Sequence, residues 1–238
     1  MTPGLINLKL NRSADVRLFC FPYAGGGDSI FHSWQQSVPA AIEVCPVQLP
    51  GRGSRIAEPP FTDISQLVCA AAQALPLDKP FALFGHSMGA LIAFELARYL
   101  RKEYSAQPLH LFVSGRPSPQ TISESYELDQ LDAALPEMLP GNPELMELVL
   151  PLLRADLAVC KSYVYTPQPP FSFPITAFGG LEDDGVPRHC LEGWREHTTG
   201  SFRLRFFPGD HFFLETCRLP LLEAISKELE QDVSRNVM

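Results

Sequence analysis

The stretch from Phe81 to Phe94 constrains this chain most, because a short apolar run leads into Gly-x-Ser-x-Gly and then into an amphipathic helical pattern. This order is typical of a sharp strand-to-helix turn that presents one serine above a β-sheet. Glycine is needed at Gly85 and Gly89, because a side chain at either position would collide with the neighbouring strand and helix. The turn also directs backbone N–H groups toward a site for negative charge. Ser87 is therefore the candidate nucleophile of a hydrolase or acyl transferase.

Composition bounds the remaining possibilities. The chain has 238 residues, of which 45% are hydrophobic, and this suits one large α/β domain or two small ones. A net charge of −8 argues against nucleic acid and anionic membranes as partners. The N-terminus lacks the pattern of a secretion signal, and the longest apolar stretch, Met88 to Leu100, is interrupted by Glu95 and Arg98. We therefore expect a cytoplasmic protein.

The six cysteines bear on redox compartment and metal binding. None forms a Cys-x-x-Cys pair, and Cys20 and Cys45 lie within apolar runs. We expect buried free thiols in a reducing compartment, and no zinc or other metal site, because no cysteine–histidine spacing fits one.

Strand-like and helix-like segments alternate along the chain. Six short runs, rich in branched or aromatic residues, predict strands at Val16–Phe21, Glu43–Leu49, Phe81–Gly85, Leu109–Ser114, Ile175–Gly179 and Phe202–Phe207. Helical patterns cover Thr62–Leu75 with Thr62 as the cap, Met88–Lys102, Pro187–His197 and Leu219–Gln231. Such alternation predicts an α/β fold whose mostly parallel sheet is covered by helices on both faces.

One region breaks the alternation. Residues 116–170 contain no convincing strand, and helical patterns cover 126–135 and 143–165, with Pro151 beginning or kinking the second helix. An insertion of this length within a compact domain is usually a functional lid, and the alternative is a packed helical subdomain without mobility. We expect a single domain over residues 1–238, with a core of 1–115 and 171–238 and a helical lid of about 116–170.

A serine hydroxyl needs a base to become a nucleophile, and His211 is the candidate. It follows the run Phe202–Phe207 through a Pro-Gly-Asp turn, so it lies just past the end of a late strand, where the catalytic groups of such sheets gather. Of the other histidines, we interpret His86 as a packing or hydrogen-bonding residue and His110 as a core or edge residue. His189 and His197 lie in a helical pattern and are predicted to be solvated.

A carboxylate is expected to hold the base. Glu182, Asp183 and Asp184 are consecutive and follow the predicted strand Ile175–Gly179, and spacing alone does not choose among them. The alternative is that all three belong to an acidic surface turn.

The glycine-rich segment Phe21–Gly27 directly follows the first predicted strand. No Gly-Lys-Ser/Thr follows it and no Gly-x-Gly-x-x-Gly is present, so it is neither a P-loop nor a dinucleotide fingerprint. The segment fits a loop that donates one backbone N–H to an oxyanion, with the N–H of Met88 as the second donor.

Several separate motifs resemble those of type II thioesterases, the stand-alone editing enzymes of polyketide and non-ribosomal peptide assembly lines. They are Phe-Pro-Tyr-Ala-Gly-Gly at 21–26, Leu-Pro-Gly-Arg-Gly-Ser-Arg at 49–55, Phe-Gly-His-Ser-Met-Gly-Ala at 84–90, Leu-Arg-Ala-Asp-Leu at 153–157, Gly-Gly-Leu-Glu-Asp at 179–183 and Pro-Gly-Asp-His-Phe-Phe at 208–213. The thioesterase that ends fatty-acid synthesis early in animals shares much of this pattern.

The resemblance implies an α/β-hydrolase fold with a helical lid, and a catalytic triad on matching positions, Ser87, Asp183 and His211. It implies oxyanion donors on the backbone of Met88 and of Ala24 or Tyr23, and substrate contacts at Tyr23 and Gly25. The partner would be an acyl or peptidyl carrier protein whose phosphopantetheine arm bears the substrate; no cofactor is implied, and we expect a monomer. Relatives often have proline after the acid, whereas this chain has Asp184-Gly185, which keeps Asp184 as the alternative.

The resemblance also bears on three residues outside the triad. It marks Asp156 as a structural anchor between lid and core. Arg52 and Arg55 would either meet a carrier protein or pair with internal carboxylates, and we favour pairing.

Other functions remain open at this point. The alternatives are a carboxylesterase acting on small oxygen esters, a medium-chain fatty acyl thioesterase, acyl transfer or cyclisation in place of hydrolysis, and a non-catalytic binding protein with this fold. The presence of every triad member argues against the last.

Overall fold

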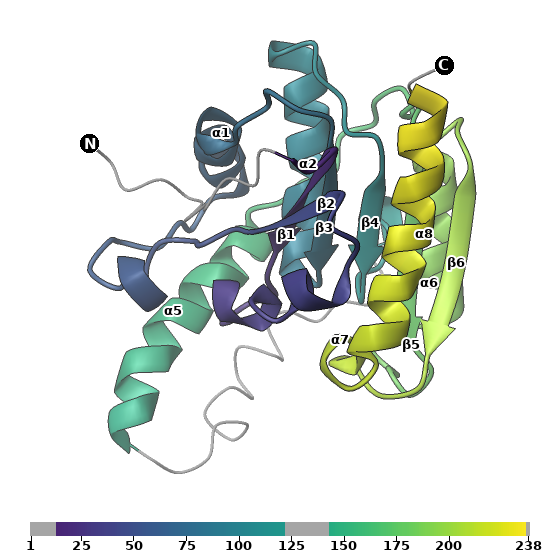
Figure 1. The fold of residues 1–238 in the computed structure, drawn as a ribbon. Coiled ribbons are helices and arrows are strands. Elements are labelled where there is room, and N and C mark those ends of the chain that lie inside the picture. Colours follow the sequence, from purple (N-terminus) through teal and green to yellow (C-terminus); the bar gives the residue numbers. More distant parts are fainter. Residues whose placement is uncertain (1–12, 122–142, 237–238) are drawn as a thin grey trace.

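A single parallel sheet organises the chain in the computed structural model, which describes residues 13–121 and 143–236 (Figure 1). Its six strands have the spatial order β2-β1-β3-β4-β5-β6, and each is parallel to its neighbours. Their bounds are β1 Val16–Phe21, β2 Ile42–Pro46, β3 Phe81–His86, β4 Leu111–Ser114, β5 Ile175–Gly180 and β6 Phe202–Phe207. The predicted parallel α/β sheet is therefore confirmed.

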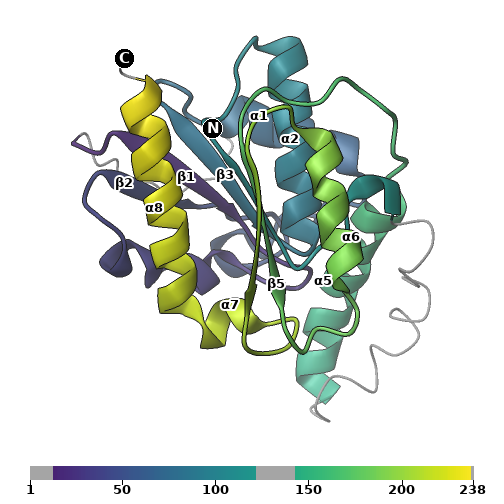
Figure 2. The same ribbon diagram turned by 90° about the vertical axis from the view of Figure 1, so that its right-hand side faces the viewer.

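Helices cover both faces of this sheet. They are α1 Ile64–Ala74, α2 Met88–Glu103, α5 Pro143–Lys161, α6 Arg188–Glu192, α7 Phe213–Thr216 and α8 Arg218–Asn236, with short 3₁₀ turns η1 Asp28–Phe31, η2 Trp34–Ser37, η3 Gly53–Arg55, η4 Pro119–Thr121 and η5 Gly193–His197. Figure 2 shows α8 against one face and α1, α2 and α6 against the other. The α5 and α7 helices lie at the lower edge in Figure 1, where the strands end.

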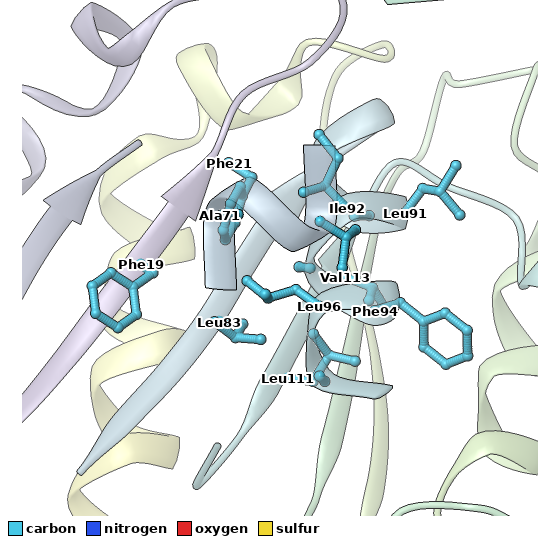
Figure 3. Close-up of a cluster of buried hydrophobic side chains, with 14 of the residues drawn as sticks. Phe19, Phe21, Ala71, Leu83, Leu91, Ile92, Phe94, Leu96, Leu111 and Val113 are labelled. Carbon is cyan, nitrogen blue, oxygen red and sulfur yellow. The ribbon is translucent and has the colours of Figure 1, made fainter. Parts of the chain in front are cut away.

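Two hydrophobic cores hold the layers together, one on each face of the sheet, and this explains why the central strands are mostly apolar. In β1, Phe19 and Phe21 face the core shared with α1 and α2, whereas Leu18 and Cys20 face the core shared with α8. All four side chains are fully buried. Neighbouring strands and α2 contribute Leu83, Ile92, Leu96 and Leu111 to the first core (Figure 3). A strand buried on both faces cannot alternate apolar and polar residues.

Helix boundaries differ from prediction where local hydrogen bonds decide them. The cap of α1 is Asp63 and not Thr62, because the Asp63 carboxylate accepts the N–H of Gln66 at 3.0 Å from an extended backbone. The helix α5 ends at Lys161 and continues through Pro151. The pattern over 187–197 divides into α6 and the tighter η5. The helix predicted at 126–135 lies outside the described residues.

Two further properties concern the described part of the chain. None of its helices combines the length and the apolar character needed to cross a membrane. All six cysteines lie in this part and are free thiols; four of them are buried, namely Cys20, Cys45, Cys160 and Cys190.

Candidate active site

Ser87 occupies a strained turn between β3 and α2. Its φ and ψ are 54° and −115°, outside the regions that L-residues prefer, and its N–H donates to the Ser114 carbonyl at 2.8 Å. A Cβ on Gly85 would lie 2.0 Å from the Gly89 carbonyl oxygen, and one on Gly89 would lie 2.1 Å from that of Phe21. The predicted need for glycine at both positions is confirmed.

His211 and Asp183 meet at the edge of the sheet where β5 and β6 end. His211 Nδ1 donates to Asp183 Oδ2 at 2.7 Å, although 28 residues separate them. The Asp183 side chain is buried, whereas Glu182 and Asp184 are exposed. This bond fixes the tautomer of the ring and leaves Nε2 as the atom able to accept a proton.

His86 lies beside both this pair and the strand-to-helix turn at Ser87, which we call the elbow. It precedes Ser87, and its ring centroid lies 5.0 Å from that of His211. His86 Nδ1 lies 2.8 Å from the hydroxyl of Ser114, which confirms its interpretation as a packing and hydrogen-bonding residue. Burial lowers the pKa of His86 well below its ordinary value, and the neighbouring His211 lowers it further. His86 therefore stays neutral and puts no second positive charge beside His211.

The hydroxyl of Ser87 forms no hydrogen bond with His211 among the described residues. Both lie beside His86, and a Cβ on Gly115 would lie 2.6 Å from the Cε1 of His86 and 3.3 Å from that of His211. Catalytic hydrogen bonds are often long in the absence of substrate and shorten in the reacting complex.

Unoccupied backbone N–H groups lie beside the turn at Ser87. Met88 is the first residue of α2, so its N–H has no acceptor within the helix. Within the described residues, no hydrogen bond occupies the N–H of Ala24. The N–H of Gly25 is occupied, because it donates to Asp156 Oδ2 at 2.7 Å. The N–H of Tyr23, the other donor expected from the sequence, forms no hydrogen bond within the described residues either, so Ala24 and Tyr23 both stay predicted as the second donor.

Tyr23 connects the glycine-rich loop to the segment after His211. Its hydroxyl donates to Glu215 Oε1 at 2.8 Å, and its ring packs edge-on against Phe212, with centroids 5.1 Å apart. Partial burial and the neighbouring Glu215 carboxylate raise the pKa of Tyr23 above its ordinary value. The hydroxyl of Tyr23 is thus engaged with Glu215, and substrate contact by this residue stays a prediction.

Arg52 and Arg55 pair with internal carboxylates, as favoured from the sequence. Arg52 contacts Asp156 through two nitrogens, and Arg55 contacts Glu58 through two. Both guanidinium groups are buried. Neither is therefore presented to a carrier protein in this structure.

Two other histidines are buried. His197 was predicted to be solvated, and this is wrong: its ring contacts Gln120 and packs against Phe94 and Trp194. A helical pattern does not reveal what packs over it. His189 is exposed, as predicted.

His110 is a core residue, as interpreted, with partners the sequence did not indicate. Its two ring nitrogens lie 2.7 Å from Asp232 Oδ2 and 2.8 Å from Thr176 Oγ1. This threonine–histidine–aspartate group resembles a triad in composition. It is structural, because the Thr176 hydroxyl is fully buried and closed to substrate.

A parallel sheet with a strained serine at a strand–helix turn, and a histidine–aspartate pair at the same edge, defines the α/β-hydrolase class. The chain belongs to the thioesterase domain family, whose pattern matches residues 16–230, and it is a hydrolase of thioesters. It is 46% identical to the gramicidin S biosynthesis protein GrsT of Aneurinibacillus migulanus, over 94% of this chain and 93% of that protein.

Solved structures agree with this assignment. RedJ, a thioesterase from the prodiginine biosynthetic pathway in Streptomyces coelicolor, has 42% identity and a TM-score of 0.84, with 91% of each chain covered. BorB, the type II thioesterase of the borrelidin biosynthetic cluster, has 35% identity and a TM-score of 0.79, with 92% of this chain and 94% of BorB covered. The predicted similarity to type II thioesterases is therefore confirmed.

Proposed function

We propose that this thioesterase removes acyl or aminoacyl groups from the phosphopantetheine arm of carrier proteins, through an acyl-enzyme on Ser87. The observation that carries the proposal is the hydrogen bond from His211 to Asp183, on the same edge of the sheet as the strained Ser87. A serine hydroxyl reacts when a base accepts its proton, and the base is effective when a carboxylate orients it.

In the first half of the proposed reaction, the Ser87 oxygen attacks the thioester carbonyl while His211 Nε2 accepts the hydroxyl proton. The N–H groups of Met88 and Ala24 stabilise the oxyanion. The carbon–sulfur bond then breaks, and the protonated ring returns its proton to the departing sulfur. A thiol has a pKa of about 8.5, so it leaves more readily than an alcohol.

Water completes the cycle. His211 removes a proton from a water molecule, which attacks the acyl-Ser87 carbonyl through a second oxyanion at the same donors. Collapse of this intermediate releases the carboxylic acid, and the ring returns the proton to Ser87. Asp183 stays ionised and stabilises the charged ring in both halves. The chain's own residues supply every group needed, without a metal or cofactor.

The biological role we propose is the clearance of stalled or aberrant intermediates from non-ribosomal peptide or polyketide synthases. GrsT, RedJ and BorB, all similar over nearly their full lengths, are named for the biosynthesis of gramicidin S, prodiginine and borrelidin, and this supports the proposal. The partner is then an acyl or peptidyl carrier protein. We further propose that the enzyme is a monomer, which size-exclusion chromatography with light scattering tests directly.

Hydrolysis of acyl groups loaded on a carrier protein tests this function. Ser87→Ala should lower turnover by up to about 10⁶-fold, and labelling by a fluorophosphonate probe should disappear with it. Ser65→Ala, at an exposed position on α1, is the matched control and should leave both unchanged. Near-normal turnover by Ser87→Ala would rule out the mechanism.

Substrate class is tested with the wild-type enzyme. We expect higher kcat/KM for carrier-bound acyl thioesters than for oxygen esters of the same acyl group. A preference for oxygen esters would favour a carboxylesterase. A preference for free medium-chain acyl thioesters over carrier-bound acetyl or aminoacyl groups would favour a role in fatty-acid release.

A further inference from the structure

A carboxylate from a distant helix holds the glycine-rich loop beside the elbow. Asp156 lies on α5, 131 residues from Gly25 in the sequence, and its Oδ2 accepts the Gly25 N–H at 2.7 Å. The carboxylate is 2% exposed. Hydrogen bonds to an ionised acceptor are about twice as strong as neutral ones, so this contact restrains the loop more than an ordinary backbone bond would.

Arg52 extends the restraint to the next residue of the loop. Its guanidinium donates to both carboxylate oxygens of Asp156, at 2.8 and 2.6 Å, and also to the Gly26 carbonyl at 2.8 Å. The ion pair thus holds two successive loop residues, one through its N–H and the other through its carbonyl. Both charged groups are almost fully buried, so water does not compete for these contacts.

Packing brings α5 against the same loop. A Cβ on Gly25 would lie 3.2 Å from Leu153 Cδ1, and one on Gly51, in the segment leading to Arg52, would lie 3.2 Å from Leu152 Cδ1. Gly25 has a φ of +77°, a backbone conformation in which a residue with a side chain would be strained. The absence of side chains at Gly25 and Gly51 therefore lets the loop pack closely against α5.

The geometry bears on the oxyanion site because Gly25 immediately follows Ala24. The peptide plane between them contains the Gly25 N–H and the Ala24 Cα. A fixed Gly25 N–H therefore fixes this plane and restrains Ala24, which carries an unoccupied donor. An N–H donor stabilises an oxyanion most when it already points at the position of the oxygen before the charge develops. A displacement of about 1 Å at such a group can reduce the rate about 100-fold.

We propose that Asp156, supported by Arg52, is a positioning residue that aims the Ala24 N–H at the thioester oxyanion. The inference rests on the proposed mechanism and goes beyond it, because it gives a lid-side helix a part in transition-state stabilisation. The competing explanation is that the ion pair only anchors α5. The two differ in what they predict for kcat in a protein that is still folded.

Asp156→Asn tests this on the full-length enzyme with a carrier-bound acyl thioester. We expect kcat to fall about 10- to 100-fold with KM nearly unchanged, because the donor matters in the transition state more than in the bound substrate. The affinity for an acyl trifluoromethyl ketone, which forms an oxyanion with the serine, should fall by a similar factor. The affinity for an unreactive thioether analogue should not change.

A second variant is needed if Asp156→Asn leaves Arg52 unpaired and thereby prevents folding. Arg52→Gln combined with Asp156→Asn removes both buried charges together, which is tolerated far better than removing one. The same fall in kcat is expected. Circular dichroism and urea unfolding at the assay temperature verify that each variant is folded.

The matched control is Glu43→Gln, which breaks another buried ion pair. Arg17 and Glu43 pair at 2.9 Å between β1 and β2, near the start of the strands and away from the site. This variant should lose stability and keep kcat. The inference is overturned if Asp156→Asn keeps kcat within about twofold, or loses no more than Glu43→Gln. Failure of the mechanism itself looks different, because wild-type turnover would then survive Ser87→Ala.

Discussion

The Nδ1 of His211 lies 2.7 Å from a carboxylate oxygen of Asp183. The Asp183 side chain is buried, whereas the neighbouring residues Glu182 and Asp184 are exposed. Three consecutive acids thus have different environments, and one of them orients the ring. The Val186 N–H also donates to the Asp183 carbonyl at 3.1 Å, which holds the turn. Of these three acids, Asp183 is the one that forms a hydrogen bond with the histidine.

Asp183→Asn should therefore reduce kcat by about 10⁴-fold, because an amide in place of the carboxylate favours the wrong tautomer of His211. Steady-state hydrolysis of a carrier-bound acyl thioester measures the effect. Asp184→Asn is the control, one residue away and exposed, and should stay near wild type. If Asp184→Asn were the damaging change, the assignment of the acid would be wrong.

Gly115→Ala should disturb the site through steric contact with two imidazole rings. Gly115 has a φ of +58°, and its added Cβ would lie 2.6 Å from the His86 ring and 3.3 Å from the His211 ring. We expect a loss of about 1–3 kcal/mol in unfolding free energy, from urea denaturation, and a lower kcat. Gly27→Ala, where the nearest atom is 3.9 Å away, should be tolerated. Equal effects of the two would contradict the steric explanation.

The strands and the elbow could be predicted because each depends on neighbouring residues. The strand β1, which is buried on both faces, is apolar apart from Arg17, and the prediction of its bounds is confirmed. The two elbow glycines are likewise part of one local turn. Spacing alone does not choose among Glu182, Asp183 and Asp184, because the choice depends on the path of the chain toward His211, and only the family motif favours Asp183.

Long-range polar contacts account for what the sequence missed. The Gly25–Asp156 bond joins residues 131 apart, and the His197–Gln120 contact joins residues 77 apart. No spacing rule encodes such pairs. The helical pattern around His197 predicts a solvated ring, yet the rings of Phe94 and Trp194 pack against it.

The buried His197 should make stability depend on pH. Burial, with a smaller effect of Arg98, lowers its pKa from 6.5 to about 4. As pH falls below 6.5, the His197 ring becomes protonated in the unfolded chain but stays neutral in the folded protein. The free energy of unfolding therefore falls between pH 6.5 and 4. Each pKa unit is worth about 1.4 kcal/mol, which makes this contribution roughly 3 kcal/mol. Urea denaturation across this range measures it.

The quantity to compare between variants is the change of unfolding free energy with pH, and not its absolute value at one pH. His197→Gln removes packing and is expected to be less stable at neutral pH, but its stability should fall less steeply on acidification. His86 is also buried with a lowered pKa, so it contributes to the pH dependence of stability in every variant. His189→Gln, at an exposed position, should leave the slope unchanged. An unchanged slope in His197→Gln would show that this histidine is protonated in the folded protein.

Acyl-chain preference should respond to α5, which belongs to the proposed lid of residues 116–170. Leu153 lies against Gly25, so Leu153→Ala opens space beside the oxyanion loop. We expect kcat/KM for longer acyl groups to rise relative to acetyl by about 10-fold, since one methylene in a pocket is worth about 1–3 kcal/mol. Competition between carrier-bound acetyl and octanoyl groups measures the ratio. Val164→Ala, at a position 80% exposed, is the control. An unchanged ratio in Leu153→Ala would mean that this part of α5 only supports the core.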